Sequence, residues 1–316
     1  MPARRFRALV DQVFNSASEL ELLLASIGFT AHAVQLEGGQ LVGRFQFLSN
    51  HHSAVLRLGS NLRISVGCPR NPALIPISLE IDGQEGVAAA HGQPIKANAV
   101  AGTSLDLTHS FFQFWPEADV VIALLPKQAL LDQLNTCGGS HCVRLMQSCN
   151  QLLLHHEIHQ ALVRQLLQWL ADPASMPLDP IASIIQFFND ETVSAGVRYR
   201  RITRYQLVFN LIALGASGAA DHLDLDQLAD CLNCSRRSLI QGCKELLGLG
   251  PKELLRIQRL EKVHQALLRH DPKIAVESRT VNAVAEQFGF HSRGHFAAAY
   301  RRQFGQLPTA SLRQRA

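Results

Sequence analysis

The sequence predicts a multidomain α+β protein with a β-rich N-terminal part and an all-helical C-terminal third. Its 316 residues suggest two domains at roughly 100–200 residues each. Between about residues 31 and 125, short apolar segments alternate with glycine-containing turns, which favours an antiparallel sandwich or barrel with added helices. From Asp221 onward the spacing is helical, with no strand-like run. The 47% apolar and 18% charged content excludes a disordered chain.

The chain also lacks the features of a membrane or secreted protein. Its apolar runs are short, such as 120–125, well below the ~20 residues that a spanning helix needs. The N-terminus is basic, but Asp11, Glu19 and Glu21 interrupt what would be the apolar core of a signal peptide. The seven cysteines show no regular disulfide framework. We therefore expect a reducing, cytoplasmic compartment and no membrane partner.

The first elements are predicted from spacing and turn residues. Apolar residues three and four apart predict a helix over 6–28 that Gly28 would end. Turns are expected at the Gly38-Gly39, Gly59, Asp82-Gly83 and Gly102 positions. Strands are expected between them, at 40–48, 54–58, 62–66, 76–81, 104–108 and 119–125.

After Pro126 the pattern becomes helical. The helix expected over 151–170 carries an apolar stripe, which is interpreted either as a core face or as a dimer seam. These patterns divide the chain into a domain over 1–170, a helical connector over 171–198 and a helical domain over 199–316. Helices are expected at 127–134, 151–170, 180–189 and 199–214, followed by a small-residue linker at 215–220.

The charge is divided unevenly along the chain. Residues 1–198 hold 12 Lys and Arg against 16 Asp and Glu, whereas residues 199–316 hold 18 against 10. A basic module attached to a mildly acidic body favours binding to a polyanion. A basic surface without such a partner is the alternative, and charge alone does not separate the two.

A near-repeat lies within the basic third. Leu228-Ala229 precedes a short turn and Ser235, and Val284-Ala285 precedes Gly289 and Ser292 in the same way. Serine suits a helix N-cap, because its oxygen accepts from free N–H groups of the first turn. Glycine suits a turn that needs positive φ. The pattern predicts two helix-turn-helix units, with their capping serines 57 residues apart.

The stretch from 228 to 312 resembles the DNA-binding domain of AraC/XylS-type transcription regulators. The first unit matches at Leu228-Ala229, Ser235-Arg236-Arg237-Ser238-Leu239, Lys244, Leu247-Gly248, Pro251 and Arg259-Leu260. The second matches at Val284-Ala285, Gly289-Phe290, Ser292, Phe296, Tyr300-Arg301-Arg302, Phe304-Gly305 and Pro308. Residues 291–296 are similar to the branch that includes the ethanolamine-operon regulator. The resemblance covers about 115 residues, from roughly 199 to the end.

The resemblance implies a transcription regulator whose protomer reads two adjacent major-groove segments of double-stranded DNA. It implies an N-terminal β-barrel of the cupin type, followed by helices, that binds an effector or forms a homodimer interface. RNA polymerase is a further partner if the protein is an activator. The helix expected over 251–270 would fix the two helix-turn-helix units relative to each other, about 10 bp apart on DNA.

The first recognition helix is expected over 235–244. Arginine suits guanine and glutamine suits adenine, so Arg237 and Gln241 are the base-reading candidates. Arg236 and Lys244 are expected on phosphate. The resemblance places Ile240 at a base-facing position, where it would touch a thymine methyl.

The second recognition helix is expected over 292–303. Arg293 is its base-reading candidate, beside Gly294 and His295, while Arg301 and Arg302 stand at its end. Ser235 and Ser292 complete the DNA-binding set as caps. A position that often carries arginine in the family is Ala298 here, which weakens the case for base reading by this helix.

A metal-dependent cupin-type enzyme is the rival function. It would need a spaced His-x-His pair and a nearby Glu around one metal. The chain offers adjacent His51-His52, isolated His91 and His109, and a helical group interpreted as solvated surface, His155, Glu157 and His159. We therefore expect no metal, no cofactor and no enzyme activity.

A cysteine-based redox sensor fused to the DNA-binding domain is the other alternative. Cys231 and Cys234 form a Cys-x-x-Cys pair inside the first helix-turn-helix. The resemblance places Cys231 near the buried end of a helix and Cys234 at the turn, which favours a small apolar role for both. Neither the effector, the operator nor the direction of regulation follows from the sequence.

Overall fold

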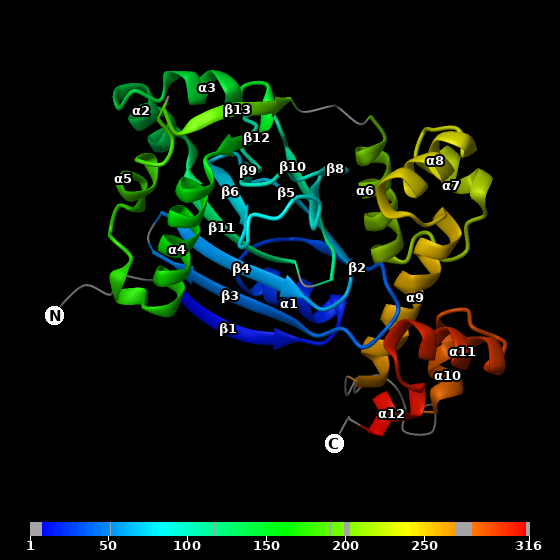
Figure 1. Ribbon diagram of the computed structural model, residues 1–316. Helices are drawn as coiled ribbons and strands as arrows, with labels where there is room; N and C mark the ends of the chain where they lie inside the picture. The colour runs from blue at the N-terminus through cyan, green and yellow to red at the C-terminus, as the bar shows by residue number, and fades with distance from the viewer. Residues whose placement is uncertain are drawn as a thin grey trace. The chain divides into compact units, whose positions relative to one another are not determined.

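The computed structural model describes residues 8–50, 52–116, 118–189, 191–198, 203–268 and 280–313. The chain forms two compact units, each described by itself. The first unit consists of residues 1–14, 43–61 and 68–201, and the second of 15–42, 62–67 and 202–316. The first unit contains most of the strands, while the helices after residue 202 all belong to the second (Figure 1). The predicted α+β class is confirmed.

An eight-stranded antiparallel sheet is the centre of the first unit, in the order β1-β3-β4-β11-β6-β9-β12-β13. Its strands are β1 (Ala8–Phe14), β3 (Gly43–Ser49), β4 (Ala54–Ser60), β6 (Leu74–Glu80), β9 (Ala99–Ala101), β11 (Asp119–Pro126), β12 (Cys149–Leu154) and β13 (Val193–Arg198). Beside this sheet, β10 (His109–Phe114) pairs with β7 (Ala88–Ala90), and β7 pairs with β8 (Gln93–Pro94). The β-rich expectation is confirmed, and closure into a barrel stays a prediction.

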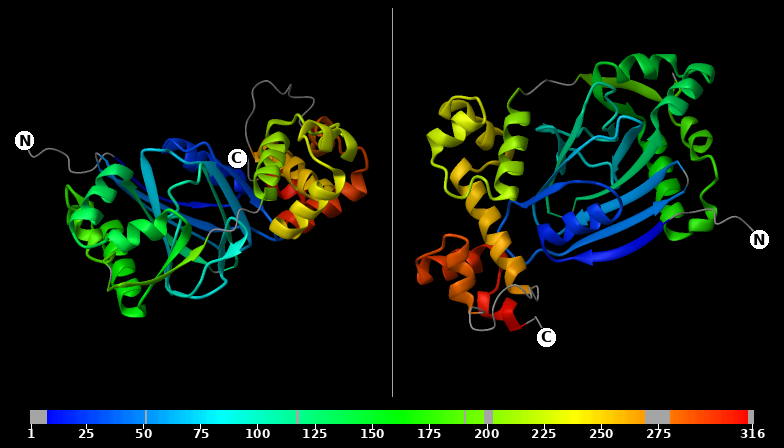
Figure 2. Two further views of the ribbon diagram at one scale, coloured as in Figure 1. Left: turned by 90° about the horizontal axis from the view of Figure 1, so that it is seen from above. Right: turned by 180° about the vertical axis from the view of Figure 1, so that it is seen from behind.

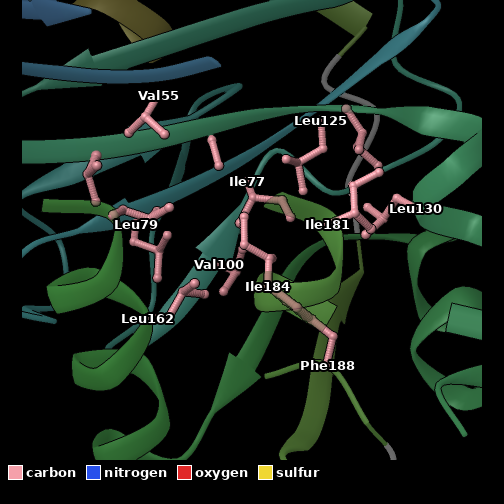
Figure 3. Packing of buried hydrophobic residues seen from close by; sticks show 14 of the residues in the cluster. Val55, Ile77, Leu79, Val100, Leu125, Leu130, Leu162, Ile181, Ile184 and Phe188 are labelled. Carbon is pink, nitrogen blue, oxygen red and sulfur yellow. The ribbon is translucent and has the colours of Figure 1, made fainter. Parts of the chain in front are cut away.

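Four helices accompany this sheet. They are α2 (Lys127–Thr136), α3 (Ser140–Met146), α4 (His156–Ala171) and α5 (Pro180–Ile185). Leu79 and Val100 of the sheet, Leu162 of α4 and Ile184 of α5 belong to one buried cluster (Figure 3). Burial of one such side chain contributes roughly 1.5–3 kcal/mol, so the cluster stabilises the unit. The apolar stripe of α4, including Leu162, Leu166 and Trp169, is therefore a core face.

The helix expected over 6–28 is a strand followed by a shorter helix. Residues 6 and 7 lie outside the described residues, β1 pairs with β3, and α1 (Ala17–Ser26) begins at Ser16. Ser16 accepts a hydrogen bond from the Glu19 backbone, and Glu19 accepts one from the Asn15 backbone. This local Ser-x-x-Glu signature is the helix start that the apolar spacing concealed.

Two further sequence-based predictions were wrong. Residues 104–108 do not form a strand, because the Ser104 backbone instead bonds the side chains of Asn150 and Arg70. Residues 149–154 form strand β12 between β9 and β13, so the helix expected over 151–170 begins only at His156. Strand β12 is buried along almost its whole length, and a short buried apolar run cannot be told from a buried helix segment by its spacing.

The region around residues 171–217 also differs from expectation. Residues 171–198, expected to be a helical connector, contain α5 and a short 3-10 turn but also strand β13. The helix expected from Tyr199, which lies outside the described residues, is α6 (Thr203–Ser217). The expected linker at 215–220 therefore begins inside α6. A Cβ at Gly215 would lie 2.0 Å from Gln258 Oε1, so this glycine serves close packing of helices.

The second unit contains one helix and a strand pair from the N-terminal part, besides the helices after residue 202. The helix is α1, and β2 (His32–Gln35) pairs antiparallel with β5 (Ile64–Pro69). Helix α9 contacts α1, β2, α6, α8, α10, α11 and α12, and its gold ribbon in Figure 2 runs from the yellow helices to the orange and red ones. The C-terminal helices are α6, α7 (Leu225–Cys231), α8 (Arg236–Leu247), α9 (Pro251–Leu268), α10 (Val281–Gln287), α11 (Arg293–Phe304) and α12 (Pro308–Arg313).

Within the described ranges, none of the helices has the length and apolar character to cross a membrane.

His159 of α4 predicts a pH-dependent stability of the first unit. Its side chain is fully buried, and neither ring nitrogen has a hydrogen-bond partner among the described residues. Burial, with a smaller effect of His156, lowers the pKa of His159 to about 4. Between about pH 6.5 and 4, His159 is therefore protonated in the unfolded chain but neutral in the folded chain. As the pH is lowered through that window, the free energy of unfolding should decrease by up to about 1.4 kcal/mol per pH unit for this residue.

Chemical denaturation between pH 4 and 8 tests this expectation. His159→Leu fills a similar volume without a titrating ring, so its stability should vary less with pH than that of the native protein. The exposed N-cap residue His155, replaced by alanine, is the control and should keep the native dependence. An unchanged dependence in His159→Leu would contradict the assignment.

Candidate nucleic-acid interface

The first helix-turn-helix unit is formed by α7 and α8. Asp224 and Gln227 make a reciprocal capping box at the start of α7. Ser235 is the N-cap of α8, and its hydroxyl accepts from the Ser238 backbone at 3.1 Å. Gly248 ends the helix with φ +76°, where a glycine avoids the Cβ penalty. The predicted capping role of Ser235 is confirmed.

Helix α8 has one buried and one exposed face. Leu239 and Cys243 are fully buried, as the apolar spacing predicts. Ile240 is half-buried. The side chains expected to meet DNA are exposed, namely Arg236, Arg237, Gln241 and Lys244. The helix therefore offers three cations and one amide along its solvent side.

An acidic residue on this face was missed by the sequence reasoning. Glu245 accepts from Gln241 Nε2 at 2.7 Å and from Arg204 Nη1 at 2.9 and 2.8 Å. The Arg204 guanidinium and then Gln241 hold the pKa of Glu245 below its usual value. A carboxylate would repel phosphate, and Arg204 of α6 offsets that charge. The Gln241 amide keeps its second N–H and its oxygen while one N–H is held by Glu245, so a donor and an acceptor remain for a base.

Arg236 also has an acidic neighbour. Its Nε lies 3.2 Å from Asp226 Oδ1, with 60% and 62% of the two side chains exposed. An ion pair so open to water contributes little, commonly below about 1 kcal/mol. Arg236 therefore remains available to a phosphate.

The second helix-turn-helix unit is formed by α10 and α11. Thr280 caps α10 by accepting from the Ala283 backbone at 3.2 Å. Gly289 adopts φ +80° in the turn, which confirms the reason for glycine there. Ser292 occupies the N-cap position of α11, but its side chain makes no capping hydrogen bond. Only its backbone carbonyl acts, accepting from Phe296 N at 2.9 Å, so the expectation of a side-chain cap was wrong.

The solvent face of α11 carries fewer polar side chains than that of α8. Ala298 is exposed, and a Cβ added at Gly294 would meet no atom within 4 Å. Arg302 Nη2 lies 3.0 Å from Glu253 Oε1 of α9. The predicted DNA-binding residues of α11 are all exposed, namely Ser292, Arg293, Gly294, His295, Arg301 and Arg302. Arg293 is exposed, and its base-reading role stays a prediction.

An aromatic cluster holds α11 in place. Phe296 is 3% exposed and packs against Phe290 and Tyr300, with ring centroids 5.2 and 5.6 Å away. The Tyr300 hydroxyl lies 2.5 Å from His264 Nδ1 and donates to Ser311 Oγ at 2.8 Å. Burial raises the pKa of Tyr300 and lowers that of His264 to about 4. Both rings are thus neutral, which suits a buried hydrogen-bonded network.

Helix α9 packs against both units. It contacts α8 of the first unit and α10 and α11 of the second, as expected for the helix that joins them. The expected range 251–270 extends past Leu268 into residues outside the described ones. The Arg259 guanidinium lies over the Phe290 ring at 5.6 Å. Glu253 of the same helix pairs with Arg256 and Arg302.

The structure does not gather the histidines considered for a metal. His51 lies outside the described residues, while His52 is exposed and His91 fully buried. His155 precedes α4 as its N-cap, and His159 is buried. The prediction that both lie on a solvated face of one helix was therefore wrong. Among the described residues no three His, Cys, Asp or Glu side chains could together hold a metal ion.

The cysteines of the first helix-turn-helix differ partly from expectation. All seven cysteines of the chain are free thiols. Cys231 is exposed at the end of α7, so its expected place near a buried helix end was wrong. Cys234 is half-buried at the turn, and burial raises its pKa. A thiol with a raised pKa is a poor nucleophile at neutral pH.

Comparison with known proteins identifies this part of the chain. A family described as a helix-turn-helix domain matches residues 228–314. The probable thc operon regulatory protein of Rhodococcus erythropolis is 29% identical over 63% of this chain and 62% of its own length. The XylDLEGF operon transcriptional activator of Pseudomonas putida is 36% identical over 29% of this chain and 28% of its own length. The chain thus spans less than two thirds of either relative.

A solved structure is also similar. It is a transcriptional regulator from Chromobacterium violaceum with an AraC-type DNA-binding domain, 27% identical at a TM-score of 0.29. The match covers 34% of this chain and 90% of that one. The narrower resemblance to the ethanolamine-operon branch stays a prediction. The wider resemblance is confirmed at the level of the domain: residues 228–314 match a helix-turn-helix domain and are similar to transcription regulators of the AraC/XylS type.

Proposed function

We propose that this chain is a sequence-specific, effector-responsive transcription regulator that reads two adjacent major-groove segments with α8 and α11. The observation that carries the proposal is the tandem of helix-turn-helix units packed on one helix, α9. Each unit buries the apolar face of its second helix and leaves cationic side chains exposed. This is the arrangement that base reading flanked by phosphate contacts requires.

The residue roles follow from chemistry and exposure. Arg237 and Gln241 of α8 and Arg293 of α11 read base edges, because their side chains match guanine and adenine. Ile240 is half-buried, so only part of it is open to a thymine methyl. Gly294 and His295 lie at the start of α11, where the backbone comes closest to DNA. Phosphate contacts are assigned to Arg236, Lys244, Arg301 and Arg302.

The remaining parts of the proposal concern the rest of the chain. We assign effector binding or dimerisation to residues 1–170 and DNA binding to 199–316, with 171–198 as the connector. RNA polymerase is the further partner if the protein activates transcription. The family relatives named above are regulators, which supports a protein without enzyme activity.

The salt dependence of DNA binding tests the proposal. Duplexes selected from a random pool with the full chain are compared with scrambled duplexes by fluorescence anisotropy. Four phosphate contacts predict that the affinity falls about 100-fold between about 50 and about 200 mM salt. The selected duplex should bind at least about a thousandfold more tightly than the scrambled one. Equal affinity for both duplexes, or a salt slope near zero, would contradict the proposed function.

A further inference from the structure

A small cavity lies in the second unit among α1, β2 and α9. Its volume is about 130 Å³, and its lining includes Ser18, Glu21, Val34, Ile257, Gln258 and Glu261. An apolar cavity of about 150 Å³ holds a benzene molecule, so this one has room for a ligand of about four to six heavy atoms. None of these residues belongs to the DNA-reading faces of α8 and α11.

Two carboxyl groups face this cavity from different elements. Glu21 Oε1 accepts from the Ala33 backbone at 2.8 Å. Glu261 Oε1 accepts from Ser18 N at 3.0 Å and from Ser18 Oγ at 2.6 Å. Glu21 Oε2 has no hydrogen-bond partner among the described residues, so one carboxylate oxygen remains for a ligand.

Burial disfavours two negative charges in this place. It raises the pKa of Glu21 to about 7, and the nearby Glu261 raises it further. Burial also raises the pKa of Glu261. Lys262 lines the same cavity, but its ammonium lies 3.2 Å from Asp221 Oδ2. His32 Nδ1 is 4.0 Å from Glu21 Oε1, and burial lowers the pKa of His32, which opposes its charged form. The pair thus lacks a cation of its own.

A third acceptor belongs to Gln258, another residue that lines the cavity. Gln258 is 8% exposed, and its Nε2 donates to the Ile212 carbonyl at 2.8 Å. Its Oε1 is buried and has no donor among the described residues. A buried acceptor without a donor costs roughly 1–3 kcal/mol. A ligand that brings N–H groups would satisfy it.

We propose that this cavity binds a small organic cation with N–H donors, held by Glu21 and Glu261 and packed on Val34 and Ile257. Glu21 supplies the counter-charge, Glu261 adds a second carboxyl oxygen as acceptor, and the apolar side chains accommodate a short hydrocarbon body. A divalent metal ion is the less suitable occupant, because hard cations take six or more oxygen ligands and this wall is partly apolar.

The cavity lies on the helix that both helix-turn-helix units share. Its residues Ile257, Gln258 and Glu261 belong to α9, which packs against α8, α10 and α11. Occupancy therefore changes the charge and packing of the element that sets the two recognition helices. Ligand binding itself is independent of the proposed function, whereas its regulatory meaning rests on that function.

Titration of the full-length protein with n-propylammonium at pH 8 tests the site. We expect saturable binding with a Kd between about 0.1 and about 10 mM, the range open to a ligand of so few atoms. Glu21→Gln and Glu261→Gln keep the acceptors for Ala33 and Ser18, and each should weaken binding about tenfold or more. Glu286→Gln, at an exposed carboxylate of α10, is the charge control and should bind as the native protein does.

The pH dependence gives a second readout. Glu21 must lose its proton to hold the cation, so affinity should rise by up to about tenfold per pH unit below pH 7 and level off above it. The charged groups nearest the pair are Glu19, His32, Asp221 and Lys262. If a glutamine variant fails to fold, the variant Ala33→Leu is tested in its place. Leucine at this lining residue fills the cavity and should weaken binding.

Several results would overturn the site. They are no saturable binding at pH 8, equal binding by Glu21→Gln, equal binding of tetramethylammonium, which has no N–H donor, and tighter binding of Mg²⁺. DNA affinity measured with and without the ligand separates the two proposals. Ligand binding that leaves DNA affinity unchanged removes the regulatory role alone. Ligand binding by a protein that binds no DNA overturns only the proposed function.

Discussion

Phe296→Ala is expected to unfold the second helix-turn-helix at temperatures where the rest of the protein remains folded. Phe296 is 3% exposed and packs between Phe290 and Tyr300. Truncation of a buried phenylalanine to alanine costs about 3–5 kcal/mol. A helix pair so small has few other contacts to replace this one. Hydrogen exchange should show early loss of protection in α10 and α11, and affinity for a selected duplex should fall by about 100-fold or more.

The neighbouring residue provides the control. His295 is exposed on the same helix, so His295→Ala should change the free energy of unfolding by less than about 0.5 kcal/mol. Protection in α7 and α8 should persist in Phe296→Ala, because these helices belong to the other helix-turn-helix. Simultaneous loss of protection in all four helices would show that the two units fold as one, contrary to the expectation.

Arg237→Ala is expected to reduce affinity for a selected duplex by about 5- to 150-fold, which corresponds to about 1–3 kcal/mol. The side chain is exposed on α8, and a bidentate contact from arginine to guanine discriminates against the other bases. The loss should concentrate on one base position of the duplex. Anisotropy with a series of single-base substitutions in the duplex measures it.

Arg236→Ala is the matched control for this substitution. Arg236 is the adjacent arginine, shares an exposed ion pair with Asp226, and is assigned to phosphate. Its replacement should weaken binding to all duplexes alike and lower the salt slope by about one contact. If Arg237→Ala gave the uniform loss instead, Arg237 would be a phosphate contact.

The helix-turn-helix units were predictable because their signals are local. Caps such as Ser235, the turn glycine Gly289 and the apolar spacing of Leu239 and Cys243 all act within a few residues. Each feature constrains backbone conformation where it stands, so the sequence and the structure agree there. The side-chain cap expected at Ser292 shows the limit of such a rule, since the position is right but the hydrogen bond is not made.

The N-terminal part was harder because its strands depend on partners far along the chain. Strand β12 pairs with β9 and β13, and its apolar residues resemble the start of the helix that follows. Strand β1 pairs with β3, while only two residues separate its end from the start of α1. Short apolar segments carry no signal that separates these outcomes. Gly215 was predicted to lie in a linker because its close contact is with Gln258 of another helix, which neighbouring residues do not indicate.

The sequence by itself determined the class of the protein, the two helix-turn-helix units and the exposed cations of their second helices. These follow from periodicity, caps and charge, which are written in neighbouring residues. Only the tertiary structure decided that Arg204 of α6 and Gln241 both bond Glu245, that His159 is buried, and that Glu21 and Glu261 share a cavity. Each of these features depends on contact between different elements, because burial, ion pairing and like-charge repulsion arise only when packing brings those elements together.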